Sequence, residues 1–175
     1  LLHRADGVHP LHHVISILMQ IQNQPVPAVG SAAPDFTLAS TSGEQVTLSS
    51  FRGKSAALIA FFPLAFTSTC TAELCEFSDD YDDFVRAGVV VLPISVDSVP
   101  TLKEFKAKHN MKTDMLSDFK RAAGQAYGVM WQDAFCTNRA YFLVDKNGVI
   151  QWEHVEETPS GKRSNAEILA EIAKL

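Results

Sequence analysis

The chain has 175 residues, which is long enough for one domain with a buried core. Its formal charge of −5, with 20% charged residues, argues against a surface that binds nucleic acid. Three cysteines are too few for a secreted scaffold held by disulfides, so we expect a reducing compartment, the cytoplasm.

Residues 1–29 differ in character from the rest of the chain. They contain four histidines, and the apolar run 14–19 is too short to cross a membrane. The segment is a poor match to a signal peptide. We therefore interpret residues 1–29 as a flexible or non-native extension, with Met19 as an alternative start, and disfavour a metal site at the histidines. Residues 30–175 are the expected domain.

The first half of this domain reads as strands alternating with helices. Residues 34–38 and 45–48 alternate apolar and polar side chains around a glycine turn, which predicts a hairpin. A buried strand is expected at 56–62, followed by a helix at 69–87. Another buried strand is expected at 89–97. Pro93 lies inside it and predicts a bulge or a shift in pairing, because proline lacks the N–H that a ladder needs.

The second half continues with two helices, a hairpin and a terminal helix. The expected ranges are 99–109 and 118–127 for the helices, 139–144 and 149–155 for the hairpin strands, and 165–175 for the last helix, capped by Asn165. This order of elements predicts an α/β fold with a central mixed sheet and helices on both faces.

The loop after strand 56–62 carries the residues most indicative of chemistry. Cys70 follows it where a helix should begin, and the open N–H groups and dipole of a helix start favour a thiolate. Pro63 has no N–H, so it can shield the sulfur without competing for it. Thr67 adds a hydroxyl that can both donate and accept. The loop predicts an activated cysteine.

Pro63, Thr67 and Cys70 match the Pro-x-x-x-Thr-x-x-Cys signature, and the chain from about Gly30 to Leu175 resembles the peroxiredoxins. It is similar to the branch that holds the bacterioferritin-comigratory-protein and AhpE-like members. The resemblance implies a thioredoxin-like fold with an N-terminal hairpin. It also implies a peroxidase that reduces H2O2 and organic hydroperoxides through a sulfenic acid on Cys70. No metal or other cofactor is implied, since sulfur carries the redox chemistry.

A thiolate alone does not make a fast peroxidase, because a less basic thiolate is also a weaker nucleophile. The leaving oxygen needs fixed donors and a cation, and the N–H groups of Thr69 and Cys70 are candidates. By resemblance, Arg139 matches the active-site arginine of the family; an ordinary salt bridge at a sheet edge is the alternative. Glu73 is expected to orient Arg139, although the helix dipole alone could favour an acid there.

Cys75 is the expected resolving thiol. It falls on the polar side of the predicted helix, where a cysteine is an unusual core filler. An intact helix separates its Cα from that of Cys70 by roughly 8–9 Å, whereas a disulfide needs less than about 7 Å. A Cys70–Cys75 bond therefore requires the first turn to unwind. The Cys-x4-Cys spacing also resembles the subgroup that resolves within one helix. Cys136 and an external thiol stay open as alternatives.

The expected partners are a hydroperoxide and a dithiol reductant of the thioredoxin or glutaredoxin type. A thioredoxin-like disulfide oxidoreductase is a rival function, but those enzymes use Cys-x-x-Cys, and no cysteine lies at that spacing from Cys70. A redox relay that senses peroxide is a second rival. The chain is expected to be a monomer or a homodimer, with a dimer favoured if Phe66 and Trp131 leave apolar surface exposed.

Overall fold

The computed structural model describes residues 24–175, and its centre is strand β3 (Ala56–Phe61), in which all six residues are buried. β3 pairs in parallel with β4 (Val89–Ser95) and antiparallel with β8 (Ala140–Val144). These three strands carry the apolar runs of the sequence, so they occupy the middle of the sheet, where both faces are covered.

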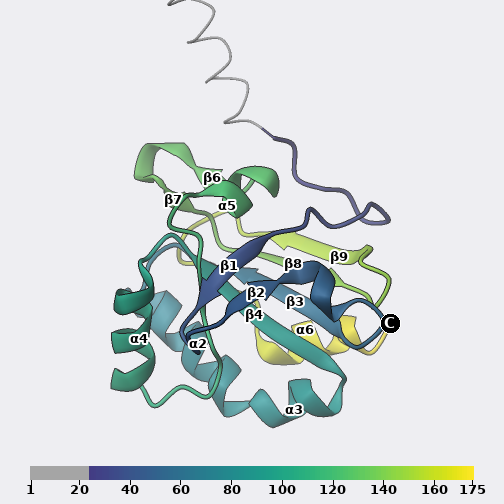
Figure 1. The fold of residues 1–175 in the computed structure, drawn as a ribbon, viewed down its shortest axis with the longest axis horizontal. Coiled ribbons are helices and arrows are strands. Elements are labelled where there is room, and N and C mark those ends of the chain that lie inside the picture. The colour runs from purple at the N-terminus through teal and green to yellow at the C-terminus, as the bar shows by residue number, and fades with distance from the viewer. Residues whose placement is uncertain (1–23) are drawn as a thin grey trace, which may run out of the picture.

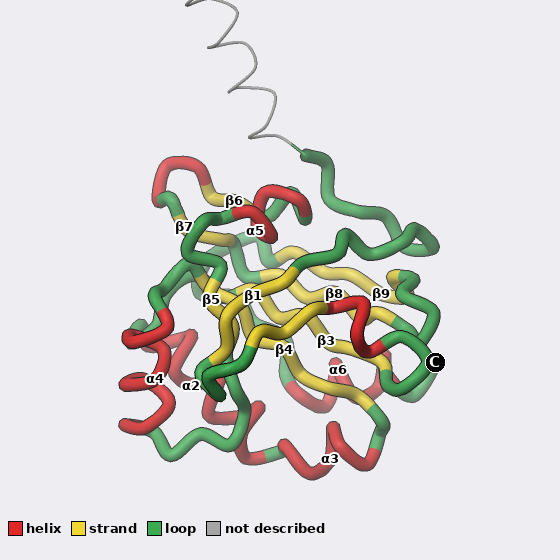
Figure 2. Tube along the Cα trace, viewed as in Figure 1, coloured by secondary structure: helices red, strands yellow, loops and turns green. Residues whose placement is uncertain are grey.

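Within residues 24–175 the main sheet has seven strands in the order β2-β1-β5-β4-β3-β8-β9 (Figures 1 and 2). The remaining strands are β1 (Thr37–Ser40), β2 (Gln45–Thr47), β5 (Leu116–Ser117) and β9 (Ile150–Val155). The mixed sheet and the N-terminal hairpin β1–β2 confirm the predicted fold class. β5 is a two-residue strand that the sequence analysis missed, because it is too short to show a periodicity.

Helices cover the two faces of the sheet unequally. Side chains of β3 alternate between the faces, so Leu58 belongs to one apolar core and Ile59 to the other. Of the helices in the described part of the chain, those that pack on the face of Leu58 are α2 (Ser68–Asp79), α3 (Tyr81–Arg86), α4 (Val99–Lys108) and α6 (Asn165–Ile172). The other face is covered by α5 (Ala122–Ala126), the 3-10 turn η1 (Leu48–Phe51) and the N-terminal hairpin.

The prediction of one helix over 69–87 was wrong, because the chain breaks between α2 and α3. Asp80 stands at the break with φ −92° and ψ 14°. Four aspartates lie within residues 79–83, and like charges three or four residues apart destabilise a continuous helix. Asn165 Nδ2 donates to Asp80 Oδ2 at 2.9 Å, which ties the break to α6. The end at Gly88 is as expected, with φ +72°.

The bulge expected at Pro93 is also absent. β3 and β4 keep one register from Ala56↔Val89 to Phe61↔Ile94. Ile94 O accepts from Phe62 N, so the backbone of the preceding residue points away from β3. On that side β5 pairs only from Ile94 onward. The nitrogen of Pro93, which carries no hydrogen, therefore points to the side of β4 on which no strand is paired at that position.

Two helix starts differ from the predictions. The helix expected at 118–127 contains only α5, because Asp118 lies before it and accepts from Ala123 N at 3.1 Å and Gly124 N at 2.7 Å. α6 starts at the predicted Asn165, but its cap is Ser164, which forms a capping box with Glu167.

A small two-stranded sheet follows α5 and was not predicted. It pairs β6 (Met130–Trp131) with β7 (Cys136–Thr137), joined by the 3-10 turn η2 (Gln132–Ala134). We refer to residues 119–137 as the β6–β7 segment. Arg121 holds this segment together, since Nε donates to Phe135 O at 2.9 Å and Nη1 to Phe119 O at 3.1 Å.

The N-terminal end of the described chain lies on the domain. Gly128 has φ +66°, and a Cβ there would come within 2.4 Å of Gln24 O, so the chain at 24–26 lies directly against it. Gly30 N donates to Ile150 O at 2.8 Å. The predictions for the histidines and Met19 lie outside the described residues. Within 24–175, no helix has both the length and the apolar character needed to cross a bilayer.

Candidate active site

The candidate site lies where β3 and β4 end side by side. Parallel strands bring their carboxyl ends to the same edge of a sheet, and the loops that follow meet there. The loop after β3 runs through Pro63, which is buried, and Thr67, which is exposed. Phe66 within it has φ +65°, a region that a bulky side chain rarely adopts. This backbone is therefore held by its surroundings rather than by local preference.

Cys70 lies in the first turn of α2 and is only 1% exposed. Thr67 occupies the N-cap position, but its side chain makes no cap hydrogen bond. Its hydroxyl instead donates to Leu64 O at 2.9 Å. The Thr67 side chain therefore leaves the first N–H groups of α2, including those of Thr69 and Cys70, uncapped. Because the Thr67 hydroxyl donates its hydrogen to Leu64 O, its lone pairs are free to accept a hydrogen bond from an incoming ligand.

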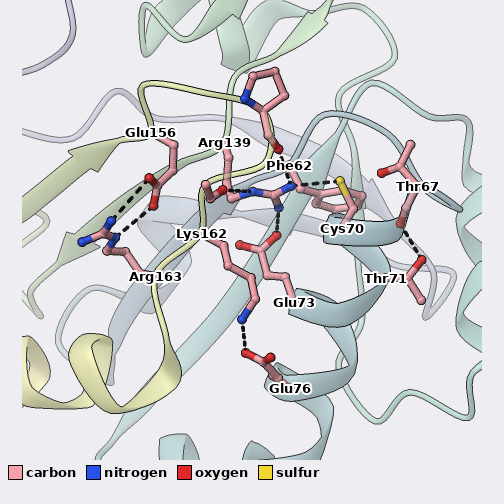
Figure 3. Close-up of polar contacts among 12 residues, drawn as sticks. Phe62, Thr67, Cys70, Thr71, Glu73, Glu76, Arg139, Glu156, Lys162 and Arg163 are labelled. Atoms are coloured by element: carbon pink, nitrogen blue, oxygen red, sulfur yellow. Dashed lines mark hydrogen bonds and ion pairs between the residues drawn. The ribbon is translucent and has the colours of Figure 1, made fainter.

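Arg139 precedes β8 and is 1% exposed, so its charge is held inside the protein. Nη2 donates to Cys70 Sγ at 3.3 Å, and Nη1 donates to Glu73 Oε2 in an ion pair. Figure 3 shows the guanidinium between the sulfur and the carboxylate. Two backbone acceptors complete its shell: Gly161 O, 2.9 Å from Nε, and Pro159 O, 3.4 Å from Nη2.

The charge of Arg139 is stable in this setting. Burial works against the charged form, but the neighbouring Glu73 and Cys70 raise the pKa of Arg139 overall. The guanidinium is thus a fixed cation in contact with the sulfur. Its partner Glu73 is on α2, so the pair spans from β8 to the helix and is not the sheet-edge salt bridge that we considered as the alternative.

Glu73 is buried between two donors. Tyr141 Oη donates to Glu73 Oε1 at 2.5 Å, on the opposite side from Arg139. Burial raises the pKa of Glu73 to about 6, and the contacts to Arg139 and Tyr141 oppose that rise. Burial and the adjacent Glu73 raise the pKa of Tyr141, so the phenol keeps its proton and remains a donor.

The other two cysteines differ in their surroundings. Cys75 is partly buried and packs against the core that α2 shares with the sheet, so it is less exposed than its polar helical face suggested. Burial, followed by Asp79 and Glu76, raises the pKa of Cys75. Cys136 is buried in β7, and burial followed by the charge of Cys70 raises the pKa of its thiol. Thr137 Oγ1, in the residue after Cys136, donates to Phe62 O at 3.0 Å, which places β7 beside the start of the loop that leads to Cys70.

This arrangement can stabilise an anion at the start of α2. One side of Cys70 is surrounded by the open N–H groups, the Arg139 guanidinium and the lone pairs of Thr67. If a small oxidant reacted there, the N–H groups and the guanidinium could donate hydrogen bonds to its leaving oxygen. Among residues 24–175, no group of three or more His, Cys, Asp or Glu side chains is placed to hold a metal ion.

Several residues near the site were missed from the sequence. Asp97 accepts from Ala65 N in the loop at 2.8 Å, and it could have been inferred from its place at the end of β4. Tyr141 could have been inferred as a buried polar group two residues after Arg139, on the same face of β8. The carbonyls of Pro159 and Gly161 leave no trace in the sequence, because any residue supplies a carbonyl.

A family model described as the AhpC/TSA family matches residues 29–153. The chain belongs to the AhpC/TSA family, the peroxiredoxins. It is thus a peroxide-reducing oxidoreductase with the thioredoxin-like fold of that family, and it is expected to use a hydroperoxide and a thiol reductant.

Relatives of this peroxiredoxin agree with the assignment. The chain is 39% identical over 131 residues to alkyl hydroperoxide reductase E of Mycobacterium tuberculosis, covering 74% of this chain and 86% of that protein. It is 40% identical over 136 residues to a putative peroxiredoxin bcp of Coxiella burnetii, covering 73% and 89%. It is also 40% identical over 125 residues to a chloroplastic peroxiredoxin Q of Oryza sativa, covering 70% and 57%.

Solved structures of peroxiredoxins share the fold. The reduced 2-Cys peroxiredoxin of Plasmodium vivax superimposes with a TM-score of 0.78 at 33% identity, covering 84% of this chain and 81% of that one. The shared fold therefore extends over most of this chain.

Proposed function

We propose that Cys70 is the peroxidatic nucleophile of this peroxiredoxin. Its thiolate attacks one oxygen of a hydroperoxide, the O–O bond breaks, and the other oxygen leaves as water or an alcohol after taking up a proton. Cys70 is left as a sulfenic acid. The observation that carries the proposal is the contact of Arg139 Nη2 with Cys70 Sγ at 3.3 Å, in a site where both residues are buried.

Four other groups have proposed roles in this step. Arg139 and the N–H groups of Thr69 and Cys70 stabilise the negative charge that develops on the leaving oxygen. Thr67 accepts a hydrogen bond from the hydroperoxide, since its own proton is committed to Leu64 O. Pro63, buried in the loop, shields the sulfur side of the site from water.

Cys75 is the proposed resolving thiol. Its thiolate attacks the sulfenic sulfur, the S–O bond breaks, hydroxide leaves as water, and a Cys70–Cys75 disulfide forms. Both cysteines lie in α2, so the first turn must unwind for the two sulfurs to meet. Unwinding also relieves the burial that raises the pKa of Cys75, which makes the attacking thiolate available. Cys136 or an external thiol is the alternative resolver.

A dithiol protein of the thioredoxin or glutaredoxin type is the proposed reductant, working in a reducing compartment such as the cytoplasm. It would attack the disulfide and return both cysteines to thiols. The two rival functions remain a thioredoxin-like disulfide oxidoreductase and a relay that passes oxidation to a partner. Failure to reduce an insulin disulfide excludes the first rival. Rapid multiple turnover with a small dithiol reductant excludes the second.

The decisive test is the mass and free-thiol count of reduced protein after one equivalent of H2O2. Wild type should lose two thiols, and Cys70→Ser should lose none. Cys75→Ser should gain the mass of one oxygen on Cys70. Cys136→Ser is the matched control and should behave as wild type. Oxidation of Cys70→Ser at the wild-type rate would refute the role of Cys70, and loss of two thiols in Cys75→Ser would move resolution to Cys136.

A further inference from the structure

Asp97 lies outside the signature residues but faces the same loop. It comes three residues after Ile94, which pairs with Phe61 at the end of β3. The loops after β3 and β4 therefore leave the sheet together, and Asp97 lies opposite the loop that carries Pro63 and Thr67.

The Asp97 carboxylate is fixed by several contacts. Its Oδ2 accepts from Ala65 N at 2.8 Å and from the hydroxyl of Ser95 at 2.8 Å. Ser95 is fully buried, and its oxygen also accepts from Asp97 N at 3.2 Å. Ser117 Oγ donates to Asp97 O at 2.6 Å, which ties the residue to β5. These bonds make Asp97 a rigid acceptor aimed at the loop.

A single peptide group connects Asp97 with Thr67. The peptide between Leu64 and Ala65 gives its N–H to Asp97 and receives the Thr67 hydroxyl on its carbonyl oxygen, at 2.8 and 2.9 Å. The peptide is planar, so fixing its N–H also fixes the direction of its C=O. A charged acceptor on the N–H further polarises the carbonyl that holds the Thr67 proton.

The loop backbone depends on such outside contacts. Phe66, between Ala65 and Thr67, has φ +65°, a strained conformation that persists only where neighbours enforce it. One neighbour is α4. The centroid of the Phe66 ring lies 5.0 Å from that of the Phe105 ring, and Lys108 Nζ lies 5.6 Å from the Phe66 centroid. Asp97 supplies the second anchor, on the backbone itself.

We propose that Asp97 is a positioning residue that orients the Thr67 hydroxyl through the Leu64–Ala65 peptide group. Without it, that peptide is free to rotate and the hydroxyl loses its fixed direction, while Cys70 and Arg139 stay where α2 and β8 hold them. The inference rests on the proposed function of Thr67 as an acceptor for the hydroperoxide.

The test is a double-mutant cycle on the second-order rate of Cys70 oxidation by H2O2. Asp97→Ala should lower this rate about 10- to 100-fold, because small misplacements of catalytic groups have effects of that size. Asp97→Asn keeps an oxygen for Ala65 N–H and should lose less than about threefold. Thr67→Val removes the hydroxyl. The double variant Asp97→Ala/Thr67→Val should match Thr67→Val within about twofold, since both changes disable one group.

A second reaction separates positioning from general damage. Alkylation of Cys70 by iodoacetamide does not need Thr67, so its rate should change by less than about threefold in Asp97→Ala. Asp82→Ala, which removes a carboxylate 69% exposed on α3, is the control for lost charge and should match wild type. If Asp97→Ala is not folded, Ser95→Ala gives the same cycle, because it removes a hydroxyl that holds the carboxylate.

Three results of the oxidation assay would overturn the inference. These are oxidation of Asp97→Ala at the wild-type rate, rate losses of Asp97→Ala and Thr67→Val that multiply in the double variant, and an Asp97→Asn variant as slow as Asp97→Ala. A parallel fall in alkylation would overturn it as well. If wild type showed no oxidation of Cys70, the proposed function itself would fail. If Cys70 is oxidised in wild type but the rate losses of Asp97→Ala and Thr67→Val multiply in the double variant, only the role of Asp97 is overturned.

Discussion

Glu73 connects protonation with the position of Arg139. It is buried, it holds Nη1 of Arg139, and Lys162 is a further positive charge acting on it. Because burial raises the pKa of Glu73 to about 6, the carboxylate is half protonated near that pH and mostly neutral below it. A neutral Glu73 attracts Arg139 less strongly, so we expect peroxide reactivity to decline below about pH 6.

Replacing Tyr141 by Phe tests this assignment. The phenol donates to Glu73 Oε1 and lowers the pKa of Glu73. Tyr141→Phe should therefore move the acidic limb of the pH–rate profile for Cys70 oxidation to higher pH. A shift of about half a pH unit or more is expected for the loss of one buried hydrogen bond. Stopped-flow oxidation of Cys70 between pH 5 and 8 measures it. Tyr81→Phe, which removes an exposed phenol on α3, should leave the limb in place; an unmoved limb in Tyr141→Phe would exclude Glu73.

Stability should change with pH in the opposite sense to activity. The pKa of Glu73 is higher in the folded chain than the ordinary value of 4.5, so the folded state holds the proton more tightly. The stabilisation from this group is present below pH 4.5 and is lost as pH rises through about 6. In Tyr141→Phe the free energy of unfolding should fall more steeply as pH rises. Urea unfolding between pH 5 and 8 measures this fall.

Helix α2 is the element that unites the chemistry, since it carries Cys70, Glu73 and Cys75. It is also tied from outside: Lys162 Nζ pairs with Glu76, one residue past Cys75, and Arg139 holds Glu73 (Figure 3). Unwinding the first turn (68–71) for a disulfide therefore separates Cys70 Sγ from Arg139 Nη2, whereas the turns that carry Glu73 and Glu76 remain anchored.

Hydrogen exchange can detect this change. In the oxidised wild type, amides of residues 70–75 should exchange at least about tenfold faster than in the reduced protein, because local opening sets the rate. Amides of 81–86 in α3 should keep their rates and serve as the internal reference. Cys75→Ser treated with H2O2 should retain the reduced pattern. A Cys70–Cys75 disulfide formed with unchanged exchange in α2 would refute the required unwinding.

How far the sequence predicts this fold depends on the length of each element. β3 and α4 were predicted almost to their ends, because apolar runs and capping residues mark them. The break at Asp80 was missed, since a contact from Asn165, 85 residues later, helps to fix it. β5 and the β6–β7 pair were also missed, because each strand has two residues and exists only through its partners.

At the candidate site, the sequence predicted residues from their chemical type and their spacing. Cys70, Thr67 and Arg139 follow from their chemistry and the family signature, and the structure brings Cys70 and Arg139 into contact. Asp97, which accepts from Ala65 N in the loop, and Tyr141, which donates to Glu73, were not predicted. Their roles come from distances across the sheet edge, which a single sequence does not contain.

Among residues 24–175, the two most exposed large apolar side chains lie on the β6–β7 segment. Phe119 is 62% exposed, Phe135 is 69% exposed, and Arg121 holds the carbonyls of both. Trp131, 38% exposed, precedes the turn to Phe135. A monomer rarely presents several large apolar residues on one segment, so we expect a homodimer that buries them.

Sedimentation equilibrium tests the dimer. Phe135→Asn should raise the dissociation constant at least about tenfold, as expected for the loss of one large apolar contact. Asparagine tolerates the φ of +54° at this position, so the fold should persist. Val85→Asn, which alters an exposed side chain on α3, should leave the constant unchanged. A wild type that sediments as a single monomer at all concentrations would refute the dimer.

The backbone carbonyls that hold Arg139 also affect how this chain can diverge. Since Pro159 O and Gly161 O are the acceptors, the loop holds Arg139 through the path of its backbone. The exposed side chains of Thr158 and Ser160 take no part. Substitutions at 158 and 160 should therefore accumulate freely over evolutionary time, whereas insertions or deletions should be rare. Position 161 is the exception, because a Cβ there would come within 2.7 Å of Glu156 Oε2.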